Sequence, residues 1–165
     1  MRLALLEAAK CTPTLAAFCV GCVITTRPPQ STSSVIISTG HSRELLGNTH
    51  AEANALSKAH TLSIDQLRAL FPTLDSSELD IDTILSHSDV YTTLEPCSIR
   101  TSGLAPCAAA LIGAKVRRCI IGVAEPLDFV ECEGARKLKE AGVEVVWLGG
   151  LEEECLATAR RGHTT

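Results

Sequence analysis

The chain has few aromatic residues and no excess of positive charge. Aromatic residues make up 3% of its 165 residues, although hydrophobic residues make up 45%. We therefore predict an aliphatic core, and the chain is long enough to bury one in a single domain over residues 1–165. A net charge of −4 and a pI near 5.7 disfavour a nucleic-acid partner, because nucleic-acid-binding domains usually carry a basic face.

Long apolar runs and a signal-peptide pattern are also missing. No apolar run approaches the ~20 residues of a membrane span, and Cys11, Thr12 and Pro13 interrupt the apolar start of the chain early. These absences predict a cytoplasmic protein without membrane contact. Free thiols persist in that compartment, so the eight cysteines favour metal binding over a disulfide scaffold.

The hydrophobic pattern predicts alternating helices and strands without an internal repeat. A helix over 1–10 precedes two β-rich segments, 18–26 and 34–39, which read as a hairpin. Further helices are expected over 50–60, 64–71, 77–85, 106–113, 131–141 and 152–161, and further strands over 89–94, 116–123 and 143–148. A hairpin followed by strand–helix–strand units indicates an α/β fold, with three α/β/α layers around a mixed five-stranded sheet.

Two stretches carry the residue types of a catalytic zinc site. One contains His50 and Glu52, and the other contains Cys97, nine intervening residues and Cys107. One neutral imidazole and two thiolates balance the charge of Zn²⁺ and leave a fourth position open for water. Glu52 then has the role of proton shuttle, as in the H-x-E … P-C-x-x-C signature of zinc deaminases. The spacing between the cysteines is longer here than in that signature.

The start of the helix over 50–60 explains how His50 and Glu52 address one site. Residues two apart on a helix point about 200° away from each other, so they share a site only at its N-terminal end. Asn48 or Thr49 is the predicted cap of that end.

A non-catalytic zinc module that binds a partner is the alternative, because His41 or Cys22 could close the fourth position. The cysteines outside the zinc site are predicted to be small hydrophobes or unpaired thiols: Cys11, Cys19, Cys22, Cys119, Cys132 and Cys155.

These residues resemble the cytidine-deaminase-like superfamily, and within it the pyrimidine deaminases of riboflavin biosynthesis. The resemblance rests on the run 91–98, on Pro106-Cys107, and on the later segments 122–126 and 141–145. Transfer-RNA adenosine deaminases and cytosine deaminases typically place only two residues between the cysteines. The runs 13–14, 17–21, 42–44, 47–50 and 100–103 resemble the fungal branch. Bacterial members usually carry a reductase domain after the deaminase, and none follows within this sequence.

The resemblance implies a zinc-dependent hydrolase that acts on a cyclic amidine C–N bond. Its substrate would be 2,5-diamino-6-(ribitylamino)pyrimidin-4(3H)-one 5′-phosphate, converted to 5-amino-6-(5-phosphoribitylamino)uracil and ammonia. The superfamily commonly forms dimers or tetramers, so a homodimer is expected. A nucleoside, nucleobase or tRNA deaminase of the same fold is the alternative.

Such a substrate needs cations for its phosphate and polar partners for its hydroxyl groups. Arg43 and Arg100 are the favoured phosphate ligands. The full set of predicted substrate-binding residues flanks the metal loops and comprises Thr12, Thr14, His41, Arg43, Glu44, Asn48, Arg100, Thr101 and Ser102.

Overall fold

A five-stranded mixed sheet forms the centre of the computed structural model, which describes residues 1–28, 31–75, 77–100, 103–126 and 133–163. The strand order is β2-β1-β3-β4-β5, where β1 pairs antiparallel with β2 and β3, and the other pairs are parallel. This arrangement confirms the predicted sheet. The strands are β1 (Gly21–Thr26), β2 (Val35–His41), β3 (Ser88–Leu94), β4 (Arg118–Val123) and β5 (Glu144–Trp147).

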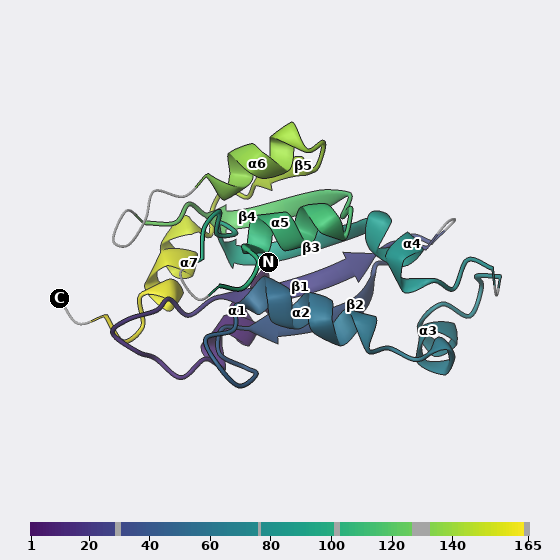
Figure 1. Cartoon of the computed structure of the whole chain (residues 1–165), viewed down its shortest axis with the longest axis horizontal. Coiled ribbons are helices and arrows are strands. Elements are labelled where there is room, and N and C mark those ends of the chain that lie inside the picture. The colour runs from purple at the N-terminus through teal and green to yellow at the C-terminus, as the bar shows by residue number, and fades with distance from the viewer. Residues whose placement is uncertain (29–30, 76, 101–102, 127–132, 164–165) are drawn as a thin grey trace.

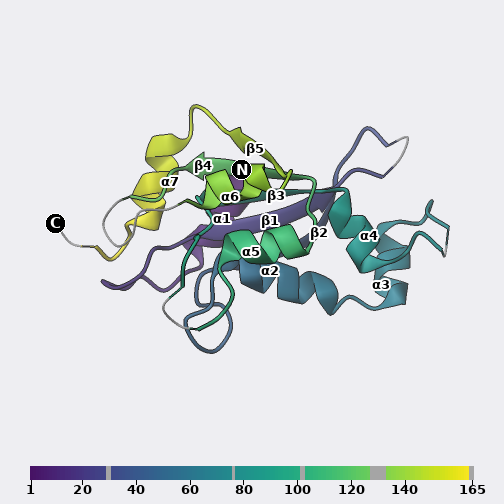
Figure 2. The ribbon, with the colours of Figure 1, turned by 45° about the horizontal axis from the view of Figure 1, so that its top comes forward.

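Helices cover both faces of the sheet and complete the three predicted layers. They are α1 (Arg2–Ala9), α2 (Ala51–His60), α3 (Ile64–Leu70), α4 (Ile81–Ser86), α5 (Cys107–Gly113), α6 (Gly134–Glu140) and α7 (Glu152–Ala159). α2, α5 and α6 lie side by side on one face (Figure 2), and α1 contacts α7 on the other. α3 and α4 extend beyond the end of the sheet that is opposite to α7 (Figure 1). Within the described residues, no helix is both long enough and apolar enough to pass through a bilayer.

The main core lies between the sheet and the layer of α2, α5 and α6, and it is largely aliphatic as predicted. Gly40 of β2 lets α2 lie directly against the sheet. A Cβ atom at this position would lie 2.3 Å from the carbonyl oxygen of Ala51 and 2.6 Å from the backbone nitrogen of Ala55. Close contact between these two backbones therefore fixes where α2 begins.

Three predicted boundaries were wrong by three or more residues. The strand expected from residue 18 begins at Gly21, because the backbone of Cys19 instead donates a hydrogen bond to the carbonyl of Ala159 at the end of α7. The helix expected from residue 77 begins at Ile81, where the Asp80 carboxylate caps it by accepting from the Thr83 backbone at 2.8 Å. The helix expected from residue 131 begins at Gly134, and residues 131 and 132 lie outside the described residues. The remaining boundaries agree within two residues.

Candidate metal centre and pocket

Three metal-ligand side chains converge where β3 ends and α2 and α5 begin. His50 directly precedes α2, Cys97 follows β3, and Cys107 is the first residue of α5. The Nδ1 atom of His50 lies 3.5 Å from the Sγ atoms of both cysteines, and all three donor atoms lie within 4.8 Å of one another. Zn–S and Zn–N bonds of about 2.3 and 2.0 Å in a tetrahedron place neighbouring donors about 3.6 Å apart. The donor set therefore fits zinc in both chemistry and spacing.

The predicted cap of α2 was wrong. His50 itself occupies the cap position, with extended backbone angles (φ −98°, ψ 156°) and no side-chain capping bond. This backbone conformation turns the imidazole toward the thiols instead of toward the free N–H groups of the helix. The Thr49 hydroxyl is occupied elsewhere, since it donates to the Leu45 carbonyl at 3.2 Å.

Asn54, which the sequence reasoning missed, holds the loop that delivers His50. Its buried amide donates to the His41 carbonyl at 2.7 Å and to the Thr49 hydroxyl at 3.0 Å. The side chain therefore ties both ends of the loop 41–49 to the first turns of α2. The sequence signal for this role is an asparagine one turn after a metal-ligand histidine, because its amide needs hydrogen-bond partners when it is buried.

The two cysteines share protons unequally in the absence of a metal. Hydrogen bonds from the Cys107 thiol and from His50 lower the pKa of Cys97 to about 4. The backbone N–H of Cys107, at the start of α5, also donates to Cys97 Sγ at 3.3 Å. The bond to Cys97 and burial raise the pKa of Cys107 well above its usual value, and the bond to Cys97 raises the pKa of His50. One thiolate thus preexists at neutral pH, and metal binding must release the proton of the other.

Glu52 lies in the first turn of α2, beside this donor set. Its side chain is almost completely buried, and burial raises its pKa. The hydroxyl of Thr92, on β3, donates to Glu52 Oε1 at 2.9 Å. Within the described part of the chain no ion pair reaches this carboxylate. A buried carboxylate of this kind at a cavity is a frequent feature of catalytic sites.

Among the described residues, the metal-ligand group consists of His50, Cys97 and Cys107 alone. No fourth protein ligand of the described chain therefore closes the position opposite these three donors. His41, one predicted candidate, has its Nδ1 atom 3.6 Å from Glu44 Oε2. Cys22, the other, is a free, fully buried thiol. This arrangement matches a catalytic site better than a closed structural one.

A cavity of about 350 Å³ opens onto the donor set. Its walls come from the loop before β1, the loop before α2, and the segments that follow β3 and β4. Of the predicted substrate-binding residues, Arg43, Asn48 and Arg100 line it. The complete lining is Ala16, Ala17, Phe18, Val20, Ser42, Arg43, Asn48, His50, Glu52, Leu94, Glu95, Cys97, Ile99, Arg100 and Glu125.

The two arginines of the pocket are held differently. Arg43 has a left-handed backbone (φ 61°), and its guanidinium donates to the Phe18 carbonyl at 3.0 Å and the Thr12 carbonyl at 2.7 Å. These bonds attach the loop before β1 to the loop before α2. Arg100 is partly exposed and donates to the Asn48 carbonyl at 2.5 Å. Arg43 therefore supports the wall of the pocket, whereas Arg100 lies at its mouth.

The other predicted substrate-binding residues that are described lie outside the lining of this cavity: Thr12, Thr14, His41 and Glu44. Glu44 forms an ion pair with Lys58 and accepts from the His41 backbone. Thr101 and Ser102 lie outside the described residues.

Glu95 and Glu125 line the pocket but were not predicted as site residues. Glu95 lies in the motif 91–98, and Glu125 lies in the motif 122–126. Glu95 Oε1 accepts from the backbone N–H of Ala135 at 2.8 Å, in the first turn of α6. The carboxylate therefore joins the loop after β3 to α6.

A neutral imidazole–dithiolate donor set with an open position, beside a buried carboxylate, defines the class of zinc-dependent hydrolytic sites. Residues 1–123 match the model of the family described as "Cytidine and deoxycytidylate deaminase zinc-binding region". The chain belongs to this family, and zinc is its cofactor.

The chain is also similar to individual proteins with more specific names. It is 41% identical over 160 residues to the diaminohydroxyphosphoribosylamino-pyrimidine deaminase of Schizosaccharomyces pombe, which covers 97% of this chain and 34% of that protein. It is 33% identical over 136 residues to the riboflavin biosynthesis protein RibD of Actinobacillus pleuropneumoniae, covering 82% of this chain and 28% of that one. The chain thus spans about a third of the length of these curated relatives.

A solved structure agrees over nearly the whole chain. The Aspergillus oryzae Rib2 deaminase, a C-terminal deletion mutant, superposes with a TM-score of 0.73 and 31% identity, over 96% of this chain and 86% of that one, in its complex with DARIPP. The likeness therefore includes the layers of the fold and the edge of the sheet where the donor set lies.

Proposed function

We propose that this chain hydrolytically deaminates 2,5-diamino-6-(ribitylamino)pyrimidin-4(3H)-one 5′-phosphate, a step of riboflavin biosynthesis. The observation that carries the proposal is the joint presence of the donor set, Glu52 and Arg100 around one cavity. The names of the relatives from Schizosaccharomyces pombe and Actinobacillus pleuropneumoniae, and the DARIPP complex of the Aspergillus enzyme, support this substrate.

In this mechanism His50, Cys97 and Cys107 hold the zinc ion. Zinc, when bound, supplies Lewis acidity that activates water at neutral pH. Glu52 removes a proton from that water and delivers it to the ring nitrogen next to the 2-amino carbon. It then takes the proton of the newly formed hydroxyl group and transfers it to the leaving amine. The ring gains a carbonyl oxygen from water, and the amino group leaves as ammonia. The raised pKa of Glu52 suits a group that must both accept and donate a proton.

The pocket has the size and polarity for the rest of this substrate. A volume of about 350 Å³ falls at the lower end of the range for small-molecule sites. Arg100, at the mouth, is the preferred phosphate ligand, because its guanidinium has N–H groups left for an anion. Arg43 is the weaker candidate, since two backbone carbonyls already occupy its guanidinium. Asn48 is placed to meet a ribityl hydroxyl.

The proposal includes the setting of the enzyme. We expect one deaminase domain over residues 1–165, a cytoplasmic location, a homodimer and no nucleic-acid partner. The acidic net charge supports the last point. Size-exclusion chromatography with light scattering tests the dimer directly.

The decisive experiment measures ammonia release by zinc-loaded protein from the ribityl and ribosyl forms of the diaminopyrimidine phosphate. We expect turnover of the ribityl form and slower turnover of the ribosyl form. Cytidine, deoxycytidylate and an adenosine-containing RNA hairpin serve as controls. Turnover of a control in place of the pyrimidine phosphate would replace this proposal by the alternative of a nucleoside or RNA deaminase.

A further inference from the structure

We propose that Thr92 is the positioning residue of the proton shuttle, and that its hydroxyl sets the orientation of the Glu52 carboxylate during deamination. This inference rests on the proposed function. Thr92 is not among the residues that line the pocket, and its hydroxyl contacts Glu52 and the Leu94 carbonyl, so its role is exerted through Glu52.

The contact is short, buried and built from two elements far apart in the sequence. Thr92 Oγ1 lies 2.9 Å from Glu52 Oε1, and both side chains are almost completely buried. The same oxygen lies 2.9 Å from the carbonyl oxygen of Leu94, at the end of β3. Because a hydroxyl has one hydrogen, it donates to Glu52 when the carboxylate is ionised, and it can donate to Leu94 when a protonated Glu52 donates to Oγ1. In both cases the hydroxyl lies between the main chain of the sheet and the carboxyl group of the helix.

Glu52 needs such a fixed point because its other contacts come from its own backbone N–H and from the thiol of Cys107, a metal ligand. A glutamate side chain has three rotatable bonds, and this one ends at a cavity of about 350 Å³. The described ion pairs include none to Glu52, so no cation holds the carboxylate.

Accurate placement matters more for this carboxylate than for an ordinary surface acid. Proton transfer needs heavy-atom distances of about 2.6–3.2 Å, and a displacement of about 1 Å in a catalytic group costs roughly 100-fold in rate. The hydrogen bond from Thr92 also couples the position of Glu52 to β3, the strand that leads into Cys97. The shuttle and one metal ligand therefore share a rigid support.

The next residue along β3 offers a matched control. Thr93 is equally buried, but its hydroxyl accepts from the backbone N–H of Gly21 at 3.1 Å, on the opposite face of the sheet, where α1 packs. Replacing either threonine by valine removes one buried hydroxyl from the same strand and keeps the shape of the side chain. The two substitutions differ in whether the lost hydrogen bond reaches Glu52.

The test compares Thr92→Val, Thr92→Ser and Thr93→Val, all loaded with zinc. For Thr92→Val we expect kcat to fall about 10- to 100-fold, with KM and zinc content close to wild type, because the contact positions a reacting group and does not bind substrate. Thr92→Ser keeps the hydroxyl and should retain kcat within about threefold. Thr93→Val should keep kcat within about twofold, whatever it loses in melting temperature. A crystal structure of Thr92→Val should show the Glu52 carboxylate rotated away from its wild-type orientation.

Wild-type kcat in Thr92→Val, or an equal loss in Thr92→Val and Thr93→Val, would overturn the inference. Thr92→Ala decides in the same way if Thr92→Val does not fold, because the smaller side chain fits the same space. The wild-type control separates this inference from the proposed function. An inactive zinc-loaded wild type removes the function, whereas an active wild type beside an equally active Thr92→Val removes only the role of Thr92.

Discussion

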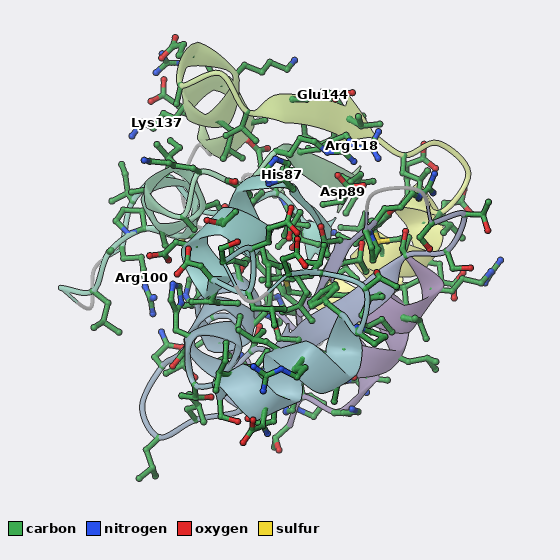
Figure 3. The ribbon with its side chains drawn as sticks, turned by 90° about the vertical axis from the view of Figure 1, so that its right-hand side faces the viewer. His87, Asp89, Arg100, Arg118, Lys137 and Glu144 are labelled. Atoms are coloured by element: carbon green, nitrogen blue, oxygen red, sulfur yellow. The ribbon has the colours of Figure 1, made fainter. Side chains whose placement is uncertain are left out.

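Two buried carboxylates lie at opposite ends of the same sheet, and their surroundings differ in kind. Glu52 is near the carboxyl end of β3, where burial raises its pKa and a hydroxyl is its hydrogen-bond donor. Asp89 is at the start of β3, between two arginines. Burial raises the pKa of Asp89, but hydrogen bonds from Arg118 and Arg117 outweigh this effect and hold it below the usual value. Figure 3 faces this end of the sheet and shows Arg118 beside Asp89, with Glu144 nearby.

The difference separates the acid that we propose as the proton shuttle from an acid that contributes to stability. A carboxylate whose charge is neutralised by arginines cannot easily take up a proton, so it is unsuited to proton transfer. A carboxylate that is buried without a cation lowers stability when it is ionised, but it takes up a proton more easily than an exposed carboxylate does. Substitutions at the two ends should therefore have opposite effects on activity and stability.

Among the substitutions, the largest effect is expected from Glu52→Gln. Deamination should fall at least ~100-fold, the usual scale for a lost general acid–base group. The zinc content should stay at the wild-type level, because Glu52 is not among the donors. The folded-state pKa is raised, so the ionised carboxylate costs stability as pH rises through that pKa. At pH 7 the metal-free variant should thus be at least as stable as metal-free wild type in urea unfolding. Near-normal turnover would remove Glu52 from the mechanism.

Removal of zinc by a chelator should abolish the activity of the same site. We expect complete loss of activity and a melting temperature lower by several degrees, because zinc binds the folded state preferentially. The released Cys97 is partly exposed and has a pKa of about 4, whereas the other free thiols of the described chain are buried. Iodoacetamide at pH 7 should therefore modify Cys97 before the other described cysteines, as read by mass spectrometry, and added zinc should protect it. Labelling of one of the buried cysteines before Cys97 would contradict this assignment.

Asp89→Asn should lower stability and leave activity nearly unchanged, which is the reverse of the effects expected for Glu52→Gln. We expect a loss of about 1–2 kcal/mol in the free energy of unfolding at pH 7, because charge-assisted hydrogen bonds from partly exposed arginines are lost. Turnover should stay within about twofold. The folded-state pKa is lowered, so the difference from wild type is present above the ordinary Asp pKa of about 3.9. It should vanish as pH falls through the folded-state pKa, and a difference unchanged at lower pH would rule out the ionised carboxylate as its source.

The smallest expected effect is the difference in stability between substitutions of the two arginines that contact Asp89. Arg118 reaches both carboxylate oxygens, at 3.2 and 2.6 Å, whereas Arg117 contacts only Oδ1 and is more exposed. Arg118→Ala should cost about 1 kcal/mol and Arg117→Ala about 0.5 kcal/mol in urea unfolding. Equal costs would mean that the second oxygen contributes nothing measurable.

The sequence was sufficient for the order of the elements and for the donor set. Alternating apolar segments predicted the five strands, and the positions of His50, Cys97 and Cys107 at the ends of elements predicted their convergence. These features depend on local patterns, which a sequence displays directly. The cap of α2 was wrong because His50 uses an extended backbone to present its ring, and no local pattern distinguishes that use from capping.

Residues that act across the fold were harder to find. Arg43 was favoured for phosphate, yet its guanidinium holds the Phe18 and Thr12 carbonyls, some 25 and 31 positions earlier in the chain. Thr92 was predicted only as one residue of the motif 91–98, and its contact with Glu52 spans 40 positions of the sequence. Pairings between distant segments exist only once the sheet has formed, so the roles of these side chains become visible only in the structure.

Gly40 has a consequence for how the enzyme tolerates change. The backbone of Ala51, between His50 and Glu52, fills the place where a side chain at position 40 would stand. Even alanine there must push the start of α2 away from β2 and separate the histidine from its cysteines. In a deep mutational scan scored on deamination, position 40 should thus be as intolerant as the zinc ligands, although it contributes no functional group. Redesign of this pocket for another amine should leave that point of contact untouched and vary the mouth near Arg100.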